Sequence, residues 1–192
     1  MPAILLNRIG QIRTQSERPF CEVIFARALR LICLPMKFIA DRMLGKLAIW
    51  LRLMGYNTLY GNTVSDEELL SLLESSPERI LLSRNTDLVE RLDPHRYIFV
   101  PPDDPKAQLR FLVKALALVP NPSCFFTRCS RCNEILEQVD RGAVAGRVPE
   151  YVWTSQEVFS RCKNCGKIYW PGTHVTRFED QLKRVLDDET VV

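Results

Sequence analysis

Two pairs of cysteines carry the clearest chemical signal in the sequence. Cys129 and Cys132 form one pair, Cys162 and Cys165 form the other, and 29 residues separate the pairs. When two residues lie between paired thiolates, both sulfurs can reach one tetrahedral zinc ion at about 2.3 Å. The spacing therefore predicts a structural Zn²⁺ site with four cysteine ligands. The alternative, two unrelated pairs of buried or redox-active thiols, explains the shared spacing less well.

A second set of residues offers oxygen ligands where predicted strands end. Asp41 directly follows the first strand, Asp66 follows the second after a short loop, and Asn85 and Asp87 follow the third. In a parallel α/β sheet, ligands bind beyond the carboxyl ends of the strands, so these side chains are expected at one edge. Gathered carboxylates repel each other unless a cation lies between them, and Mg²⁺ or Mn²⁺ prefers oxygen ligands. This set predicts metal-assisted hydrolysis of a phosphodiester.

The same residues have a simpler explanation, because Asp and Asn are common N-terminal caps of helices. Each of them taken alone fits a cap at least as well as a catalytic ligand. Basic residues expected near the same edge favour a phosphate-binding site, although Arg84 equally fits a solvated side chain. These basic residues are Arg42, Lys46, Arg52 and Arg84.

The elements that must position these residues alternate between strands and helices from Met36 onward. The predicted strands are Lys37–Ala40, Tyr56–Tyr60, Arg79–Ser83 and Tyr97–Val100. Helices are predicted over Arg42–Met54, from near Asp66, from Asn85 to Leu92, and over Asp104–Val119. A Ser65–Glu68 capping box and the Asp104–Pro105 pair mark two helix starts, and Gly55 suits a left-handed helix stop. The alternation predicts an α/β fold with a parallel sheet and helices on its faces.

Composition and charge exclude several classes of protein. The 192 residues are 46% apolar and 26% charged, which excludes collagen-like, disordered and multi-span membrane proteins. The apolar stretch 23–34 contains two arginines and is shorter than the roughly 20 residues of a membrane span, so no membrane partner is expected. No cleavable signal segment precedes the cysteines, which leads us to expect a cytoplasmic protein with reduced thiols. A net charge of +3 does not by itself indicate a nucleic-acid partner.

The pattern changes after Pro122 to cysteines, glycines and short apolar runs, and we place a domain boundary there. The predicted organisation is an N-terminal extension outside the core fold, an α/β domain, a ribbon around the four cysteines, and a C-terminal tail. Their ranges are 1–35, 36–122, 123–182 and 183–192.

Four segments together resemble the Mut-seven C-terminal RNase domain family over about residues 36 to 182. They are Phe38–Gly55 (FIADRMLGKLAIWLRLMG), Ile80–Asn85 (ILLSRN), Arg128–Asn133 (RCSRCN) and Cys165–His174 (CGKIYWPGTH). The resemblance implies a PIN-like three-layer fold with a mainly parallel sheet, followed by a small four-cysteine zinc ribbon. It also implies a metal-dependent ribonuclease, with Asp41 at the first acidic position and Asp66 at the second.

The third acidic position departs from the family pattern. The family reads Thr-Arg-Asp there, whereas this chain has Ser83-Arg84-Asn85. An amide oxygen can coordinate a cation but brings no charge, so the affinity for Mg²⁺ should fall unless Asp87 takes over.

These observations lead to a specific functional prediction. Asp41, Asp66 and Asp87, aided by Asn85, would hold one or two Mg²⁺ or Mn²⁺ ions for cleavage of RNA. Tyr169 or Trp170 would stack a base or, alternatively, pack the core of the ribbon. The residues predicted to contact RNA are Arg42, Lys46, Arg84, Arg128, Arg131, Lys163, Lys167 and His174.

Two alternatives stay open at this point. Asn85 favours an RNA-binding or ribosome-associated adaptor that keeps the fold but has lost the nuclease activity. A ribbon used for protein contacts alone is compatible with the ten basic and ten acidic residues after position 123.

Overall fold

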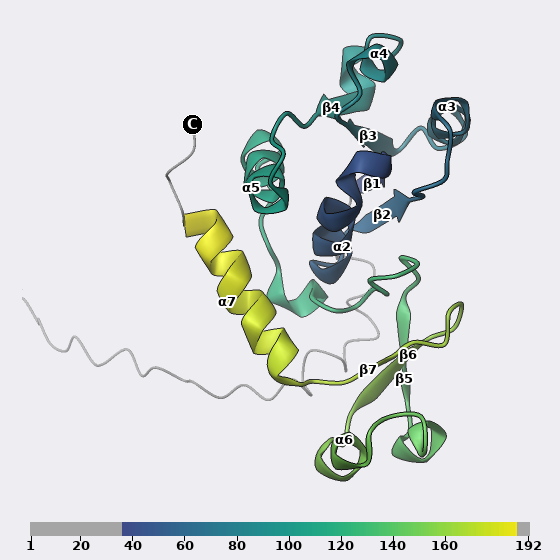
Figure 1. The fold of residues 1–192 in the computed structure, drawn as a ribbon, viewed down its shortest axis with the longest axis vertical. Coiled ribbons are helices and arrows are strands. Elements are labelled where there is room, and N and C mark those ends of the chain that lie inside the picture. Colours follow the sequence, from purple (N-terminus) through teal and green to yellow (C-terminus); the bar gives the residue numbers. More distant parts are fainter. Residues whose placement is uncertain (1–35, 188–192) are drawn as a thin grey trace, which may run out of the picture.

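The computed structural model describes residues 36–187, and the predicted N-terminal extension lies outside the described residues (Figure 1). Four strands form one sheet in the order β2-β1-β3-β4, and every pairing in it is parallel. Their bounds are Lys37–Ala40 (β1), Asn57–Tyr60 (β2), Arg79–Ser83 (β3) and Tyr97–Phe99 (β4). β1 and β3 match the prediction to the residue, and β2 and β4 are each one residue shorter. The predicted α/β fold with a mainly parallel sheet is confirmed.

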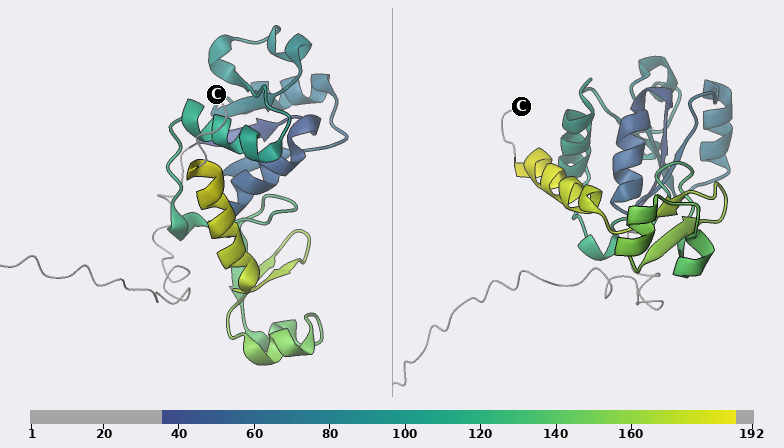
Figure 2. Two further views of the ribbon diagram at one scale, coloured as in Figure 1. Left: turned by 60° about the vertical axis from the view of Figure 1, so that its left-hand side comes forward. Right: turned by 60° about the horizontal axis from the view of Figure 1, so that its bottom comes forward.

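Helices cover both faces of this sheet, which gives three layers (Figure 2). One face carries α2 (Gly45–Leu53), α5 (Pro105–Ala115) and α7 (Thr173–Asp187), and the other carries α3 (Asp66–Glu74) and α4 (Thr86–Val89). Side chains of a strand alternate between the two faces. Accordingly, Phe38 and Ala40 of β1 join the core under α2, whereas Ile39 joins the core under α3.

The helix ends follow the predicted local signals. Ser65 and Glu68 form both hydrogen bonds of the capping box at the start of α3, and Asp104 caps α5 ahead of Pro105. Gly55 ends α2 with a φ of 96°, and a Cβ atom there would lie 2.5 Å from the carbonyl oxygen of Cys124. α5 stops at Ala115, before the predicted Val119, because Ala117 takes a left-handed conformation with a φ of 46°.

A second, smaller sheet contains Cys162 and packs against the other three cysteines. Its strands pair antiparallel in the order β5-β6-β7, with bounds Leu136–Val139, Phe159–Cys162 and Ile168–Tyr169. A short 3₁₀ helix (Arg141–Val144) and α6 (Glu150–Ser155) lie between β5 and β6. Two small apolar clusters hold this unit together, one around the cysteines and one around Phe159. Within residues 36–187, no helix combines the length and apolarity needed to cross a bilayer.

The last helix, α7, follows the ribbon in the chain and packs against the core of the four-stranded sheet. Phe178, Leu182 and Val185 are buried in the same core as α2 and α5, and the buried Arg110 Nε donates to the Val185 carbonyl at 2.8 Å. The boundary predicted at residue 182 therefore falls inside a helix. α7 completes the core over the four-stranded sheet, although the ribbon separates it from that sheet along the chain.

Candidate functional site: an acidic edge and a four-cysteine group

Asp41 lies at the carboxyl end of β1 and is only 3% exposed. Its Oδ2 accepts hydrogen bonds from the Ser83 hydroxyl at 2.6 Å and from the Arg84 amide at 2.8 Å, and its Oδ1 accepts from the Met43 amide at 2.8 Å. A carboxylate has about four lone-pair positions, so these three donors leave one position, on Oδ1. Asp41 is therefore a helix cap whose carboxylate is held in a fixed orientation, with one lone-pair position left open on Oδ1.

Ser83 supports the candidate site from below, and it was not among the residues predicted from the sequence. Its side chain is completely buried, and its hydroxyl donates to Asp41 while it accepts from the Asn85 amide at 3.0 Å. It thereby links the end of β1 to the end of β3. The available signal was a hydroxyl residue directly after the apolar run Ile80–Leu82.

Asn85 pairs with Asp66 across the gap between β3 and α3. Its Nδ2 donates to Asp66 Oδ2 at 2.9 Å, and its Oδ1 accepts from the Leu88 amide at 3.3 Å as the cap of α4. Two carboxylates at that separation would need a proton or a cation between them. The amide supplies a hydrogen there instead, so the pair is stable without an ion.

These residues line one cavity of about 380 Å³ at the carboxyl edge of the sheet. The lining residues are Asp41, Arg42, Met43, Asp66, Arg84, Asn85, Thr86 and Asp87. The four predicted oxygen ligands are thus brought to the same cavity from the ends of three strands. Within residues 36–187, however, the carboxylates of Asp41, Asp66 and Asp87 do not approach one another as closely as the cysteine sulfurs do.

The basic residues at this edge differ in how they are held. Arg84 forms an ion pair with Asp103 and also donates from Nη2 to the Pro101 carbonyl at 3.4 Å, so it is not simply a solvated side chain. Arg42 and Lys46 are exposed beside the cavity and along α2. Arg52, expected near this edge, lies instead at the opposite end of α2, because a helix of this length carries its last turn away from the sheet's carboxyl edge.

The four cysteines form a group able to hold a metal ion. All four sulfurs lie within 4.8 Å of one another, with 3.5 Å between Cys129 Sγ and Cys165 Sγ and 3.3 Å between Cys132 Sγ and Cys162 Sγ. A tetrahedral zinc site with bonds of about 2.3 Å requires sulfurs roughly 3.8 Å apart. The sulfurs are therefore close to the required geometry, and the residues fit a zinc ion.

The surroundings give the thiols different acidities. Burial alone would raise the pKa of Cys129, but hydrogen bonds from the Tyr169 hydroxyl and from nearby backbone amides lower it to about 6. Burial raises the pKa of Cys162 to about 12. The group thus includes one thiol that is readily ionised and one that gives up its proton reluctantly.

The comparison with known families matches residues 36–182 to the Mut7-C RNAse domain. This chain belongs to the Mut7-C RNAse domain family. The match covers the sheet, the acidic edge and all four cysteines, and it indicates a nuclease-related role. No curated protein and no solved structure matches the chain.

Several basic residues of this Mut7-C chain's ribbon are engaged within the protein. Arg128 donates to the carbonyls of Gly55 at 3.1 Å and Asn133 at 3.0 Å, and burial lowers the pKa of its guanidinium. Lys163 pairs with Glu137 at 3.2 Å but its side chain stays 70% exposed. Arg131 and Lys167 are also exposed, so these three remain accessible.

The aromatic residues of the ribbon pack against its own small clusters. Tyr169 packs beside the cysteines and Trp170 beside Phe159, which is the alternative that the sequence left open for them. His174 lies in the first turn of α7, edge-on to Trp170 and to Phe126 with ring centroids 6.1 Å apart in both cases.

The two sites of the Mut7-C chain lie at opposite ends of the parallel sheet. The first cysteine pair contacts the amino end of β2, through Asn57 and Thr58, whereas the acidic cavity follows the carboxyl ends of the strands. The length of β2 places them at least roughly 10 Å apart. A ligand that touches both must therefore be extended.

Proposed function

We propose that this protein is a PIN-like, metal-dependent ribonuclease. The observation that carries the proposal is the single cavity that receives Asp41, Asp66, Asn85 and Asp87 from the ends of three parallel strands. The nuclease unit comprises residues 36–122 together with α7, and the ribbon between them assists RNA binding.

The residues of the cavity have distinct parts in this proposal. Asp41 presents Oδ1 in a fixed direction because three donors hold its carboxylate. Asp66 and the exposed Asp87 offer further oxygens, and Asn85 contributes an amide in place of a charge. One or two Mg²⁺ or Mn²⁺ ions held there would supply Lewis acidity and an activated water. Arg42 at the cavity attracts the phosphate.

The RNA would continue from the cavity toward the ribbon. Lys46 is exposed in the first turn of α2, and Arg131, Lys163 and Lys167 are exposed on the ribbon. Phosphate contacts of this kind bind an extended strand without reading its sequence.

Incubation of purified protein with end-labelled single-stranded RNA and Mn²⁺ tests the hydrolase. We expect cleavage by the natural sequence and a loss of at least about 100-fold in Asp41→Asn, because that change removes the charge of the best-oriented ligand. An unaltered rate in Asp41→Asn would refute the assignment, since the activity would then come from another site or a contaminant.

The hydrogen bond between Asn85 and Asp66 favours a second candidate, an RNA-binding adaptor of the same fold without nuclease activity. Filter binding over a range of salt concentrations distinguishes the two. Salt-sensitive RNA binding with no Mn²⁺-dependent cleavage identifies the adaptor, whereas absence of any salt-sensitive RNA binding contradicts both candidates.

A further inference from the structure

The first cysteine turn closes the free edge of the parallel sheet. Within residues 36–187, β2 is an edge strand that pairs only with β1, so its outer backbone groups need other partners. The amide of Thr58 donates to Asn133 Oδ1 at 2.9 Å, and the carbonyl of Thr58 accepts from Arg52 Nε at 2.9 Å. Thr58 is completely buried as a result.

Both of these side chains are held by the turn that carries the cysteines. Asn133 directly follows Cys132, and its amide donates to the Cys129 carbonyl at 2.9 Å. Arg52 Nη1 donates to the carbonyls of Ser130 and Arg131, at 3.2 and 2.9 Å, which lie between the paired cysteines. The conformation of the cysteine turn therefore sets the partners of β2.

The two cysteine turns have nearly the same backbone conformation at the residue that follows the second cysteine, but this residue is asparagine in the first turn and glycine in the second. Asn133 has a φ of 69°, and Gly166, which follows Cys165 in the same way, has a φ of 70°. Each donates its amide to the carbonyl of the first cysteine in its pair at 2.9 Å. Glycine adopts this conformation without strain. The side chain of Asn133 is thus not needed to form the turn, and its contacts are with the sheet.

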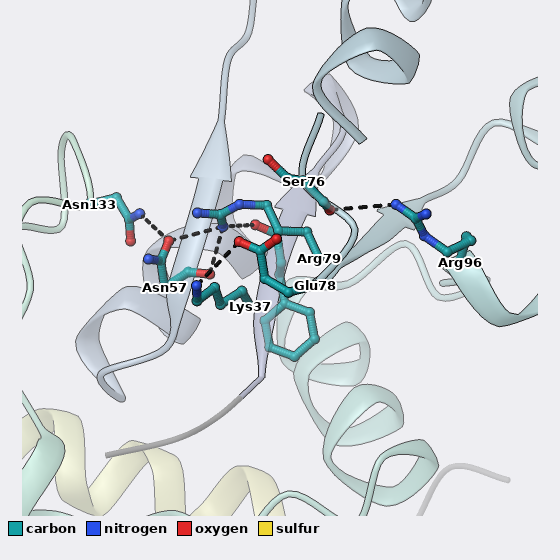
Figure 3. Close-up of polar contacts among 8 residues, drawn as sticks. Lys37, Asn57, Ser76, Glu78, Arg79, Arg96 and Asn133 are labelled. Atoms are coloured by element: carbon teal, nitrogen blue, oxygen red, sulfur yellow. Dashed lines mark hydrogen bonds and ion pairs between the residues drawn. The ribbon is translucent and has the colours of Figure 1, made fainter. Parts of the chain in front are cut away.

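A chain of hydrogen bonds continues from Asn133 across the sheet (Figure 3). Asn133 Nδ2 donates to Asn57 Oδ1 at 2.8 Å, and the same oxygen accepts from Arg79 Nη1 at 3.0 Å. Arg79, from β3, also donates to the Phe38 carbonyl of β1 at 3.1 Å. The chain ties the amino ends of β2, β1 and β3 together. These are the three strands whose carboxyl ends lead to the acidic cavity.

We infer that the metal-bound cysteine turn positions the acidic edge through Asn133, Asn57 and Arg79. A zinc ion fixes the turn, the turn fixes Asn133, and Asn133 fixes the alignment of the strands that deliver Asp41, Asp66 and Asn85. Asn133 touches none of these residues, so it is a positioning residue. The functional importance of the acidic edge rests on the proposed function. The structural coupling between the cysteine turn and that edge does not.

Amide hydrogen exchange in the full-length, zinc-loaded protein tests the coupling without RNA or Mn²⁺. Two amides serve as reporters: Thr58, which donates to Asn133, and Arg84, which donates to Asp41 at the acidic edge. In Asn133→Gly we expect both amides to exchange at least about 10-fold faster. The absorption spectrum of the Co²⁺-substituted variant should keep its tetrathiolate bands, because glycine suits the turn.

Two further comparisons keep the test decisive. Asn164→Gly makes an asparagine-to-glycine change in the second cysteine turn, at an exposed position two residues before Gly166, and should leave both amides unaltered. Asn57→Ala should accelerate Arg84 exchange, and Asn57→Asp, which keeps an oxygen acceptor, should restore it. Unaltered Arg84 exchange in Asn133→Gly, or an equal effect in Asn164→Gly, would overturn the inference. Failure of the natural sequence to bind Mn²⁺ or cleave RNA would remove the proposed function while leaving this result valid.

Discussion

The amide of Asn85 donates to Asp66 at 2.9 Å in a cavity that otherwise concentrates negative charge. An amide here makes the edge stable without a cation and lowers the charge available to bind one. The same contact therefore bears on both stability and function, and a single substitution separates these effects.

Asn85→Asp should make the stability of the protein depend on divalent metal. Without metal, two carboxylates would lie within hydrogen-bond distance and lower the melting temperature. With Mn²⁺ the extra charge should tighten binding, on the order of 10-fold, and restore the melting temperature. Differential scanning calorimetry with and without Mn²⁺ measures this, with Asn85→Ser as the uncharged control. Equal responses of the two variants to Mn²⁺ would contradict the assignment of this cavity as a metal site.

At the four-cysteine group, metal affinity should rise with pH. A thiol must lose its proton before it binds a metal ion. Burial raises the pKa of Cys162 to about 12, so at neutral pH this thiol is protonated and the metal ion must displace its proton. Each displaced proton increases the apparent affinity about 10-fold per pH unit. Below pH 6 the dependence should steepen, because Cys129, with a pKa of about 6, is then also protonated. Co²⁺ titrations at several pH values measure the slope, and a flat profile would contradict a thiolate site.

At the scale of single elements, α7 adds buried side chains to the core of the parallel sheet from a distant part of the chain. Phe178 packs against Trp50, Phe125 and Phe126, with ring centroids 5.0 to 5.5 Å apart, and is 6% exposed. Phe178→Ala should lower the free energy of unfolding by about 3–5 kcal/mol. Guanidinium unfolding measures it, and the exposed neighbour Arg177→Ala should change stability by less than about 0.5 kcal/mol. A small effect at Phe178 would show that α7 is only loosely attached.

The elements that could be predicted from the sequence are those with local causes. The capping box at Ser65, the Asp104–Pro105 helix start and the Gly55 stop depend on neighbours along the chain, and each forms as expected. The paired cysteines were recognisable because their spacing is itself the signal. The return of α7 was not predicted, although its buried residues recur at helical spacing, because that spacing does not say which core the helix joins.

Within the candidate site, the sequence indicated the candidate metal ligands but not the residues that hold them in place. Asp41, Asp66, Asn85 and Asp87 were expected at one edge because the carboxyl ends of parallel strands meet there. Ser83 and the Arg84 amide, which orient Asp41, become visible only when β1 and β3 lie side by side. Arg52 was expected at the acidic edge, whereas its contacts lie with Thr58 and the cysteine turn.

At the scale of the whole molecule, removal of zinc should loosen the ribbon and leave the rest folded. The ribbon has only small apolar clusters around its cysteines and Phe159, so a metal bound there would supply much of its folding free energy. The two ends of the ribbon are anchored in the main core, through Phe125 before it and Phe178 after it. Limited proteolysis with a chelator should therefore give new cuts between residues 129 and 168 but not within α7. A cleavage pattern that the chelator does not change would rule out a stabilising metal.

In chains that fold while zinc is scarce, the cysteine turn would not hold Asn133 and Arg52 in place. The backbone amide and carbonyl of Thr58 would then be exposed to solvent. An edge strand with unpaired backbone groups can pair with a strand of another polypeptide. Two copies of this chain could therefore pair through β2 without any further change in either copy. The amount of zinc in the growth medium should consequently decide how much of the expressed protein is recovered in solution and how much in inclusion bodies.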